Sequence, residues 1–193
     1  MTIEKTSALK IEDLKINKTL ELTITALLSA LAIALRLFKH LILGPIQVIN
    51  IPAAISIVTA LILGGIAGAS VGLISIIGSD LILGFGLWTI VTSLFLVAIS
   101  ILISTLRNKL ADRTQLFSIL IVILFINDVF TSTILYMILG FEFNTALITS
   151  IIGLFLPAGG GYMIAPGPIT EISTSLLVVT IKPVIKKAIL EVT

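Results

Sequence analysis

Apolar residues dominate the chain in long runs that short polar segments separate. The runs cover residues 19–38, 51–63, 66–83, 88–106, 116–139 and 169–185. Most of them approach the roughly 20 residues that a helix needs to cross a hydrocarbon core of about 30 Å. The pattern predicts an all-α fold, an integral membrane bundle of six transmembrane helices that forms one domain over residues 19–190. Residues 1–18 mix both charges and predict a cytoplasmic N-terminal tail.

The third run carries regularly spaced small residues, with Gly68, Gly72 and Gly78 among alanines and serines. Small residues about four apart line one face of a helix, so another helix can approach closely. The third helix is therefore predicted to have a tightly packed side. Its break at Ser79 and Asp80 predicts a polar loop that touches a ligand, because an acid in lipid is costly unless it faces a partner or a cavity.

The first run has a second small-residue pattern, in which Ala26, Ala30 and Ala34 recur on one helix face. Two interpretations stay open. The alanines pack inside the protein's own bundle, or they form a docking face for a separate membrane subunit. Both use the same physics, because helices without bulky side chains come close and gain dispersion contacts.

Residues 140–168 do not fit a full span. Residues 144–156 are apolar but short for crossing a membrane, and the following PAGGGYMIAPGP cannot continue a helix. We predict a short interfacial or re-entrant helix followed by a loop, between spans five and six.

The basic residues predict the orientation. With six spans, one side of the membrane holds nearly all of them: Lys5, Lys10, Lys15, Lys18, Arg107, Lys109, Arg113, Lys182, Lys186 and Lys187. The other side holds only Arg36 and Lys39. Because lysine and arginine accumulate in cytoplasmic segments, both termini are expected in the cytoplasm. A seventh span at 144–156 would move the C-terminal lysines outside, which the same rule disfavours.

Composition supports a multi-pass protein of the cell membrane. Apolar residues make up 58% of the chain, charged residues 11%, and the mean hydropathy is +1.24. The net charge of +2 is small, and the basic residues lie in short flanks between the apolar runs. The expected partner is therefore the lipid bilayer, and no nucleic acid is expected to bind. The chain has no cysteine and one histidine, His40, which argues against thiolate or histidine metal sites. The nucleotide-binding motif GxxxxGK[ST] is absent, and the single histidine does not support a serine–histidine–acid triad. We therefore expect neither an enzyme nor a bound cofactor.

Polar residues near the outer level of the spans, together with Asn127 and Asp128 deeper in the fifth span, are the candidates for substrate binding, because polar groups in spans are expensive unless paired. The candidates are Arg36, Gln47, Asn50, Asp80, Trp88, Asn127, Asp128, Tyr162 and Glu171. Five of them come from different spans and reach the same outer level, namely Arg36, Asp80, Trp88, Tyr162 and Glu171. Such a convergence at a bundle mouth is typical of small-molecule sites.

Each of four candidates also has a purely structural interpretation. Asp80 is expected to pair with Arg36 if it does not contact a ligand. Trp88 is expected to anchor the membrane–water interface. Asp128 hydrogen-bonds a neighbouring helix in the alternative view, and Glu171 complements the dipole of the last helix.

Several motifs in order resemble the substrate-binding membrane subunits, or S components, of energy-coupling factor (ECF) vitamin transporters. The first span contains ALLSALAIALR and the third GGIAGASVGLISIIGSDLILGFG. The fifth ends in ILYMILGFEFNTAL, and the last opens with Pro-Gly-Pro and closes with PVIKKAI. The resemblance extends over most of residues 19–190.

The resemblance implies a six-helix subunit that captures a vitamin or similar micronutrient from outside. It also implies partners, namely a transmembrane T component and two ATPase subunits. The face of Ala26, Ala30 and Ala34 would then dock the T component. The family's pocket lies near the outer surface, bounded by the loop after span one and by spans four to six.

Two hypotheses of different class follow. In the first, the chain is a binding subunit that delivers its substrate within an ATP-driven complex and does not hydrolyse ATP itself. In the second, it is a self-sufficient secondary transporter with Asp128 as the ion- or proton-coupling group, although no internal repeat supports it. A membrane scaffold without a ligand is a weaker third option.

Overall fold

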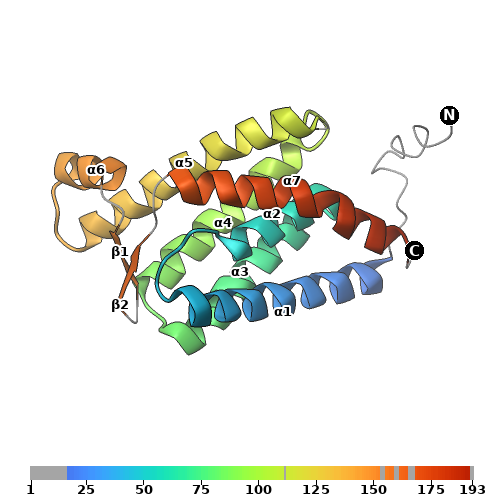
Figure 1. Ribbon diagram of the computed structural model, residues 1–193, viewed down its shortest axis with the longest axis horizontal. Helices are drawn as coiled ribbons and strands as arrows, with labels where there is room; N and C mark the ends of the chain where they lie inside the picture. Colours follow the sequence, from blue (N-terminus) through green and yellow to red (C-terminus); the bar gives the residue numbers. More distant parts are fainter. Residues whose placement is uncertain (1–16, 111, 153–154, 159–160, 165–167, 192–193) are drawn as a thin grey trace.

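The computed structural model describes residues 17–110, 112–152, 155–158, 161–164 and 168–191. In this part of the chain seven α-helices form an elongated bundle with a short β-hairpin at one end (Figure 1). The elements are α1 (Lys18–Leu43), α2 (Ile51–Ile62), α3 (Gly65–Leu83), α4 (Leu87–Leu106), α5 (Arg113–Ile138), α6 (Phe143–Ile152), β1 (Phe155–Ala158), β2 (Gly161–Ile164) and α7 (Pro168–Leu190). The predicted tail falls almost entirely on residues 1–16, which lie outside the described residues.

The predicted apolar runs all correspond to helices. Five of these, α1, α3, α4, α5 and α7, are long and apolar enough to cross a membrane. The run at 51–63 forms α2, which has only 12 residues. A multi-pass helical bundle is thereby confirmed, with five long apolar helices and one shorter one.

Polar residues set several helix boundaries. Asn17, Asn50 and Asp112 precede α1, α2 and α5, and each side chain accepts a hydrogen bond from a backbone N–H three residues later. Such caps satisfy backbone donors that lack a partner within the helix. Gly44 and Gly84 follow α1 and α3 with φ values of +61° and +122°, a conformation that favours glycine.

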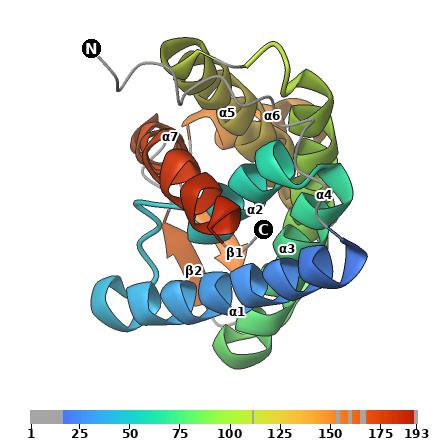
Figure 2. The same cartoon turned by 90° about the vertical axis from the view of Figure 1, so that its right-hand side faces the viewer.

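The short α2 lies inside the bundle, where it packs against α1, α3, α4 and α7. Every residue from Pro52 to Ile62 is buried. Figure 2, which looks along the bundle, shows α2 among these neighbours. Neighbouring helices therefore shield α2, which explains how an element this short is accommodated among longer ones.

The small residues of α3 do pack tightly, as the sequence predicts. A Cβ atom added to Gly68 would lie 2.5 Å from Ala60 Cβ on α2, and one added to Gly72 would lie 2.8 Å from Ser56 Oγ. A Cβ atom on Gly78 would lie 2.7 Å from Ile33 Cδ1 on α1. At Gly68 the nearest atoms include the backbone of Ala60, so glycine is required there for the close approach of α2 and α3. At Gly78 the nearest atom is the end of the flexible Ile33 side chain, which can move aside.

The predicted polar loop at Ser79 and Asp80 is wrong. Both residues lie within α3, which continues to Leu83, and both are buried. The helix is not interrupted because Asp80 finds a partner on α1, and a paired acid does not need a loop or solvent.

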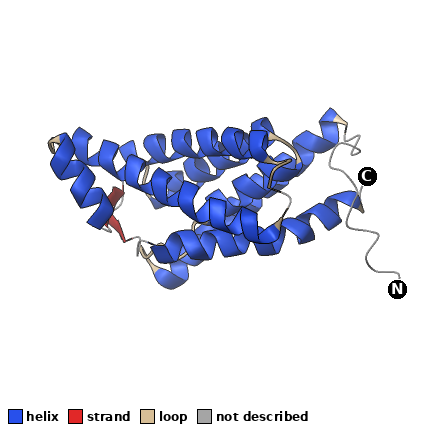
Figure 3. Ribbon diagram, turned by 90° about the horizontal axis from the view of Figure 1, so that it is seen from above, coloured by secondary structure: helices blue, strands red, loops and turns tan. Residues whose placement is uncertain are grey.

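The segment after α5 contains the predicted short helix, α6. The prediction that only a loop follows this helix is wrong, because part of that stretch forms a β-hairpin. β1 and β2 pair antiparallel, with Phe155 opposite Ile164 and Ala158 opposite Gly161. Aromatic and branched residues on either side of a glycine run favour a hairpin. The fold is therefore helical with one added hairpin (Figure 3).

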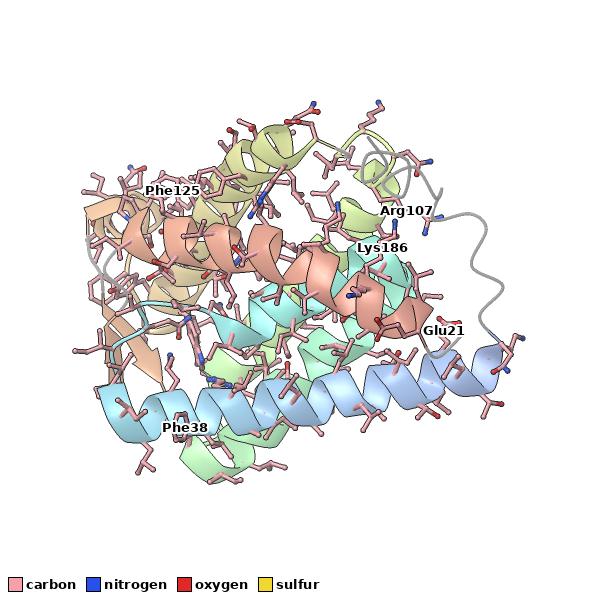
Figure 4. All side chains as sticks on the ribbon, turned by 45° about the vertical axis from the view of Figure 1, so that its right-hand side comes forward. Glu21, Phe38, Arg107, Phe125 and Lys186 are labelled. Atoms are coloured by element: carbon pink, nitrogen blue, oxygen red, sulfur yellow. The ribbon has the colours of Figure 1, made fainter. Side chains whose placement is uncertain are left out.

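The two ends of the bundle differ. The start of α1 and the end of α7 lie together at one end, while α6 and the hairpin lie at the other (Figure 1). Figure 4 shows Arg107 and Lys186 at the first end and Phe38 and Phe125 toward the second. We call these the basic end, defined by Lys18, Arg107, Lys109, Arg113, Lys186 and Lys187, and the hairpin end, defined by α6, β1 and β2.

Candidate functional site

Arg36 and Asp80 join α1 to α3 by a buried ion pair. Arg36 Nη2 lies 2.7 Å from Asp80 Oδ1, and the two residues are 4% and 2% exposed. Arg36 Nη1 also donates to the Ser79 hydroxyl and, at 3.4 Å, to the carbonyl of Ile76. The structural interpretation of Asp80 is confirmed, although its second oxygen, Oδ2, is buried without a hydrogen-bond partner.

A second group of polar side chains lies on α4, α5 and α7, and all of them are buried except Asn127, which is half-buried. Its members come in pairs spaced four residues apart: Trp88 with Thr92, Asn127 with Thr131, and Glu171 with Ser175. Residues at this spacing share one helix face. We call these six residues the interior polar set.

Every member of the interior polar set has a buried atom without a hydrogen-bond partner. The atoms are Trp88 Nε1, Thr92 Oγ1, Asn127 Oδ1, Thr131 Oγ1, Glu171 Oε2 and Ser175 Oγ. Leaving a buried polar group unpaired costs about 1–3 kcal/mol, so such groups are rare in native proteins. Six such atoms on three helices make the region between α4, α5 and α7 the candidate site for a polar ligand.

Asp128 adds a second acid to this region. Its carboxyl group is close enough to that of Glu171 to interact with it directly. Asp128 Oδ1 also accepts a hydrogen bond of 2.9 Å from the Asn127 carboxamide. The structure therefore brings together two acids, from α5 and α7, that lie 43 positions apart in the sequence.

The loop between α1 and α2 is fixed to the start of α7. The carbonyl of Gln47 accepts a hydrogen bond from Thr170 Oγ1, and the N–H of Asn50 donates to Thr174 Oγ1 at 2.9 Å. Thr170 directly precedes Glu171, so both loop residues lie near the interior polar set. The Asn50 side chain is already engaged in capping α2, whereas the Gln47 side chain is buried.

Trp88 is not an interface anchor, contrary to the structural interpretation of this residue. It is 5% exposed and packs against Leu135 of α5. An anchoring tryptophan would present its ring to the membrane–water interface. Here the ring is enclosed because α4 begins against α5 and the hairpin.

Tyr162 lies on β2, opposite Pro157, and its side chain is outside the described residues. Sequence reasoning missed Thr92, Thr131 and Ser175. A usable signal existed, because each lies four residues after a chosen candidate. Among the described residues, no group of three acidic or histidine side chains is arranged to hold a metal ion.

The alanine pattern of α1 faces outward. Ala26, Ala30 and Ala34 are all exposed, whereas Leu28, Ala32 and Arg36 occupy the buried face. The interpretation that these alanines pack inside the protein's own bundle is therefore wrong. The outward face is free to meet lipid or another helix.

Five helices of the described chain are long and apolar enough to cross a membrane, which places the protein in the class of multi-pass helical membrane proteins. Residues 16–180 match the family described as ECF-type riboflavin transporter, S component, and the chain belongs to this family. It is thus a multi-pass protein of the cell membrane and a substrate-binding transporter subunit, not an enzyme. No curated protein and no solved structure matches the chain.

Proposed function

We propose that this subunit captures riboflavin from outside the cell and delivers it together with a T component and two ATPase subunits. The observation that supports the substrate is the interior polar set, taken with the family to which the chain belongs. The unpaired atoms include donors, on Trp88 and the hydroxyl residues, and acceptors, on Asn127 and Glu171.

Riboflavin suits such a set of atoms. Its flat ring system carries carbonyl acceptors and an N–H donor, and its ribityl chain carries several hydroxyl groups. A largely apolar site with a few well-placed polar groups binds such a molecule, because the apolar walls enclose the ring while polar groups fix its orientation. The indole of Trp88 and the hydroxyl groups of Thr92, Thr131 and Ser175 are of the right kinds for both tasks.

The orientation in the membrane follows from the charges. Six spans, counting the short α2, would return the chain to the side where it began. The basic end would then face the cytoplasm, because lysine and arginine accumulate there. The hairpin end, with the loop of Gln47 and Asn50, would face outside and admit the substrate to the interior polar set.

Docking of the T component is assigned to the exposed face of Ala26, Ala30 and Ala34. Small residues at this spacing let two helices approach closely in a membrane. The buried pair of Arg36 and Asp80 holds α1 in the rotation that turns this face outward.

The competing hypothesis, a secondary transporter coupled through Asp128, makes a different prediction. Asp128 contacts Glu171 and Asn127 within the site, which suits a role in substrate binding. Uptake by a secondary transporter would persist without ATPases. Uptake by the proposed subunit requires them.

The test measures binding and uptake separately. Purified protein in detergent should quench riboflavin fluorescence on binding with a stoichiometry of one. Cells that express the subunit should take up riboflavin only when the T component and ATPases are also present. Binding without any ATPase-dependent uptake would overturn the delivery mechanism, and lack of binding would overturn the substrate assignment.

A further inference from the structure

Basic side chains from two distant parts of the chain come together at the basic end. Lys182 of α7 donates from Nζ to the carbonyl of Leu110, in the turn between α4 and α5, at 3.5 Å. Arg107 belongs to the same turn, because the N–H of Leu110 donates to the carbonyl of Arg107 at 3.3 Å. Lys186 lies four residues after Lys182 and shares its helix face, and the two ammonium groups are close enough to repel each other. We call Arg107, Lys182 and Lys186 the cationic cluster.

The acids of this end do not neutralise the cationic cluster. The described ones are engaged or lie on another helix: Asp112 caps α5, Glu191 pairs with Lys187, and Glu21 lies on α1, which packs against α2 and α3. Among the described residues neither Arg107 nor Lys182 forms an ion pair with an acid. The bond from Lys182 to a neutral carbonyl is long and uses one of its three N–H donors.

Burial distinguishes the cationic cluster from the other basic residues nearby. Lys109 and Arg113 are exposed, so water satisfies their charges. Arg107 and Lys182 are half-buried against the rest of the bundle. A cation that has lost part of its hydration is stabilised by an anion beside it, which the described chain does not supply.

The position of the cationic cluster indicates the kind of anion. Arg107 directly follows α4 and Lys182 lies in the second half of α7, and both helices are long and apolar enough to span the membrane. The same helices expose the apolar side chains of Leu102 and Val184 nearby. An anionic group that continues into apolar chains matches this combination of charge and exposed apolar surface.

We propose that Arg107, Lys182 and Lys186 form a binding site for the phosphate group of an anionic phospholipid. With the orientation proposed above, this lipid belongs to the cytoplasmic leaflet. Ammonium and guanidinium groups bind phosphate oxygens through charge-assisted hydrogen bonds, and basic sites between membrane helices hold anionic head groups. The site lies at the opposite end of the bundle from the hairpin, so the inference does not depend on the identity of the transported substrate.

The first experiment compares lipids on the wild-type protein. The purified protein in detergent is titrated with phosphatidylglycerol or with phosphatidylcholine of the same acyl chains, and bound lipid is measured by native mass spectrometry. We expect phosphatidylglycerol to bind at least about 10-fold more tightly than the zwitterionic lipid. Glycerol 3-phosphate, a soluble phosphate monoester, should not displace the bound phosphatidylglycerol at the same concentration.

The outcomes separate the possible ligands. Equal binding of the two lipids would refute a site for anionic lipid. Displacement by an equal concentration of glycerol 3-phosphate would assign the cationic cluster to a soluble anion and would also refute the inference. Neither result changes the measurement of riboflavin binding, so the proposed function stands or falls separately.

A second experiment assigns the lipid preference to these side chains. Arg107→Gln and Lys182→Gln should each weaken phosphatidylglycerol binding by about 5-fold and leave phosphatidylcholine binding unchanged. Lys182→Arg keeps the charge and should keep the preference. Lys18→Gln is the matched control, because it removes one positive charge from α1 at the same end of the bundle.

An equal loss of phosphatidylglycerol binding in the Lys18→Gln control would show a diffuse effect of net charge and overturn the assignment. An unchanged preference in both Arg107→Gln and Lys182→Gln would overturn it as well. Should the half-buried Lys182 prove necessary for folding, Arg107→Gln and the wild-type comparison of lipids still decide.

Discussion

Arg36 and Asp80 form an ion pair of 2.7 Å between α1 and α3, and both side chains are buried. The pair fixes the rotation of α1. Residues two apart on a helix point in directions that differ by about 200°, so burial of Arg36 turns Ala34 outward. The same contact that holds α1 to the bundle therefore presents the alanine face to the surroundings.

Removing one partner of this pair should destabilise the protein strongly. Asp80→Asn leaves the guanidinium of Arg36 buried without a counter-charge, which costs about 3–5 kcal/mol in the free energy of unfolding. The measurement is chemical or thermal unfolding of the purified protein in detergent. As a control, Lys187→Met breaks an exposed pair with Glu191 and should cost at most about 1 kcal/mol. Equal losses in the two variants would contradict the structural role of the buried pair.

Gly68 should not tolerate even alanine. An added Cβ would lie 2.5 Å from Ala60 Cβ and 2.8 Å from the backbone of the same residue, so α2 and α3 would have to separate. We expect Gly68→Ala to cost about 1–3 kcal/mol in the free energy of unfolding. Ile66→Ala on the exposed side of α3 should have little effect. A stable Gly68→Ala protein would show that the two helices are further apart than described.

Ala30→Leu should weaken assembly with the T component without unfolding the subunit. Ala30 is exposed on α1, so a larger side chain does not disturb the bundle but blocks close approach of another helix. The measurement is copurification of the tagged subunit with its partners. Ala98→Leu places the same change on an exposed position of α4 and should copurify normally. A complex that survives Ala30→Leu unchanged means that docking uses another face.

Thr131→Val and Ser175→Ala should weaken riboflavin binding without loss of stability. Each hydroxyl is buried and makes no hydrogen bond as described, so its removal leaves no protein partner unpaired. A hydrogen bond to the ligand contributes about 0.5–1.5 kcal/mol, which predicts a roughly 2- to 10-fold weaker affinity for each change. Thr105→Val, at an exposed position of α4 far from the site, is the control. Unaltered riboflavin affinity in both site variants would show that the hydroxyl groups of Thr131 and Ser175 do not contact the ligand.

Sequence reasoning identified many residues of the candidate site, but not all of them. Asp80 and Arg36 could be suggested as partners because each is an expensive charge in an apolar span. Thr92, Thr131 and Ser175 were missed because isolated hydroxyl residues are common in membrane helices and satisfy themselves against their own backbone. Only the absence of such a bond in the folded chain distinguishes them from the many others. The side-chain position of Tyr162 stays a prediction.

The sequence by itself determined the helical membrane class, the approximate bounds of the helices and the tight face of α3. These are local properties, since hydropathy and the spacing of glycines act within one segment. Only the tertiary structure decided which face of α1 is outward, that Trp88 is enclosed and that Asp128 meets Glu171. Those outcomes depend on how each helix is rotated against its neighbours, and that rotation results from contacts between residues far apart in the chain.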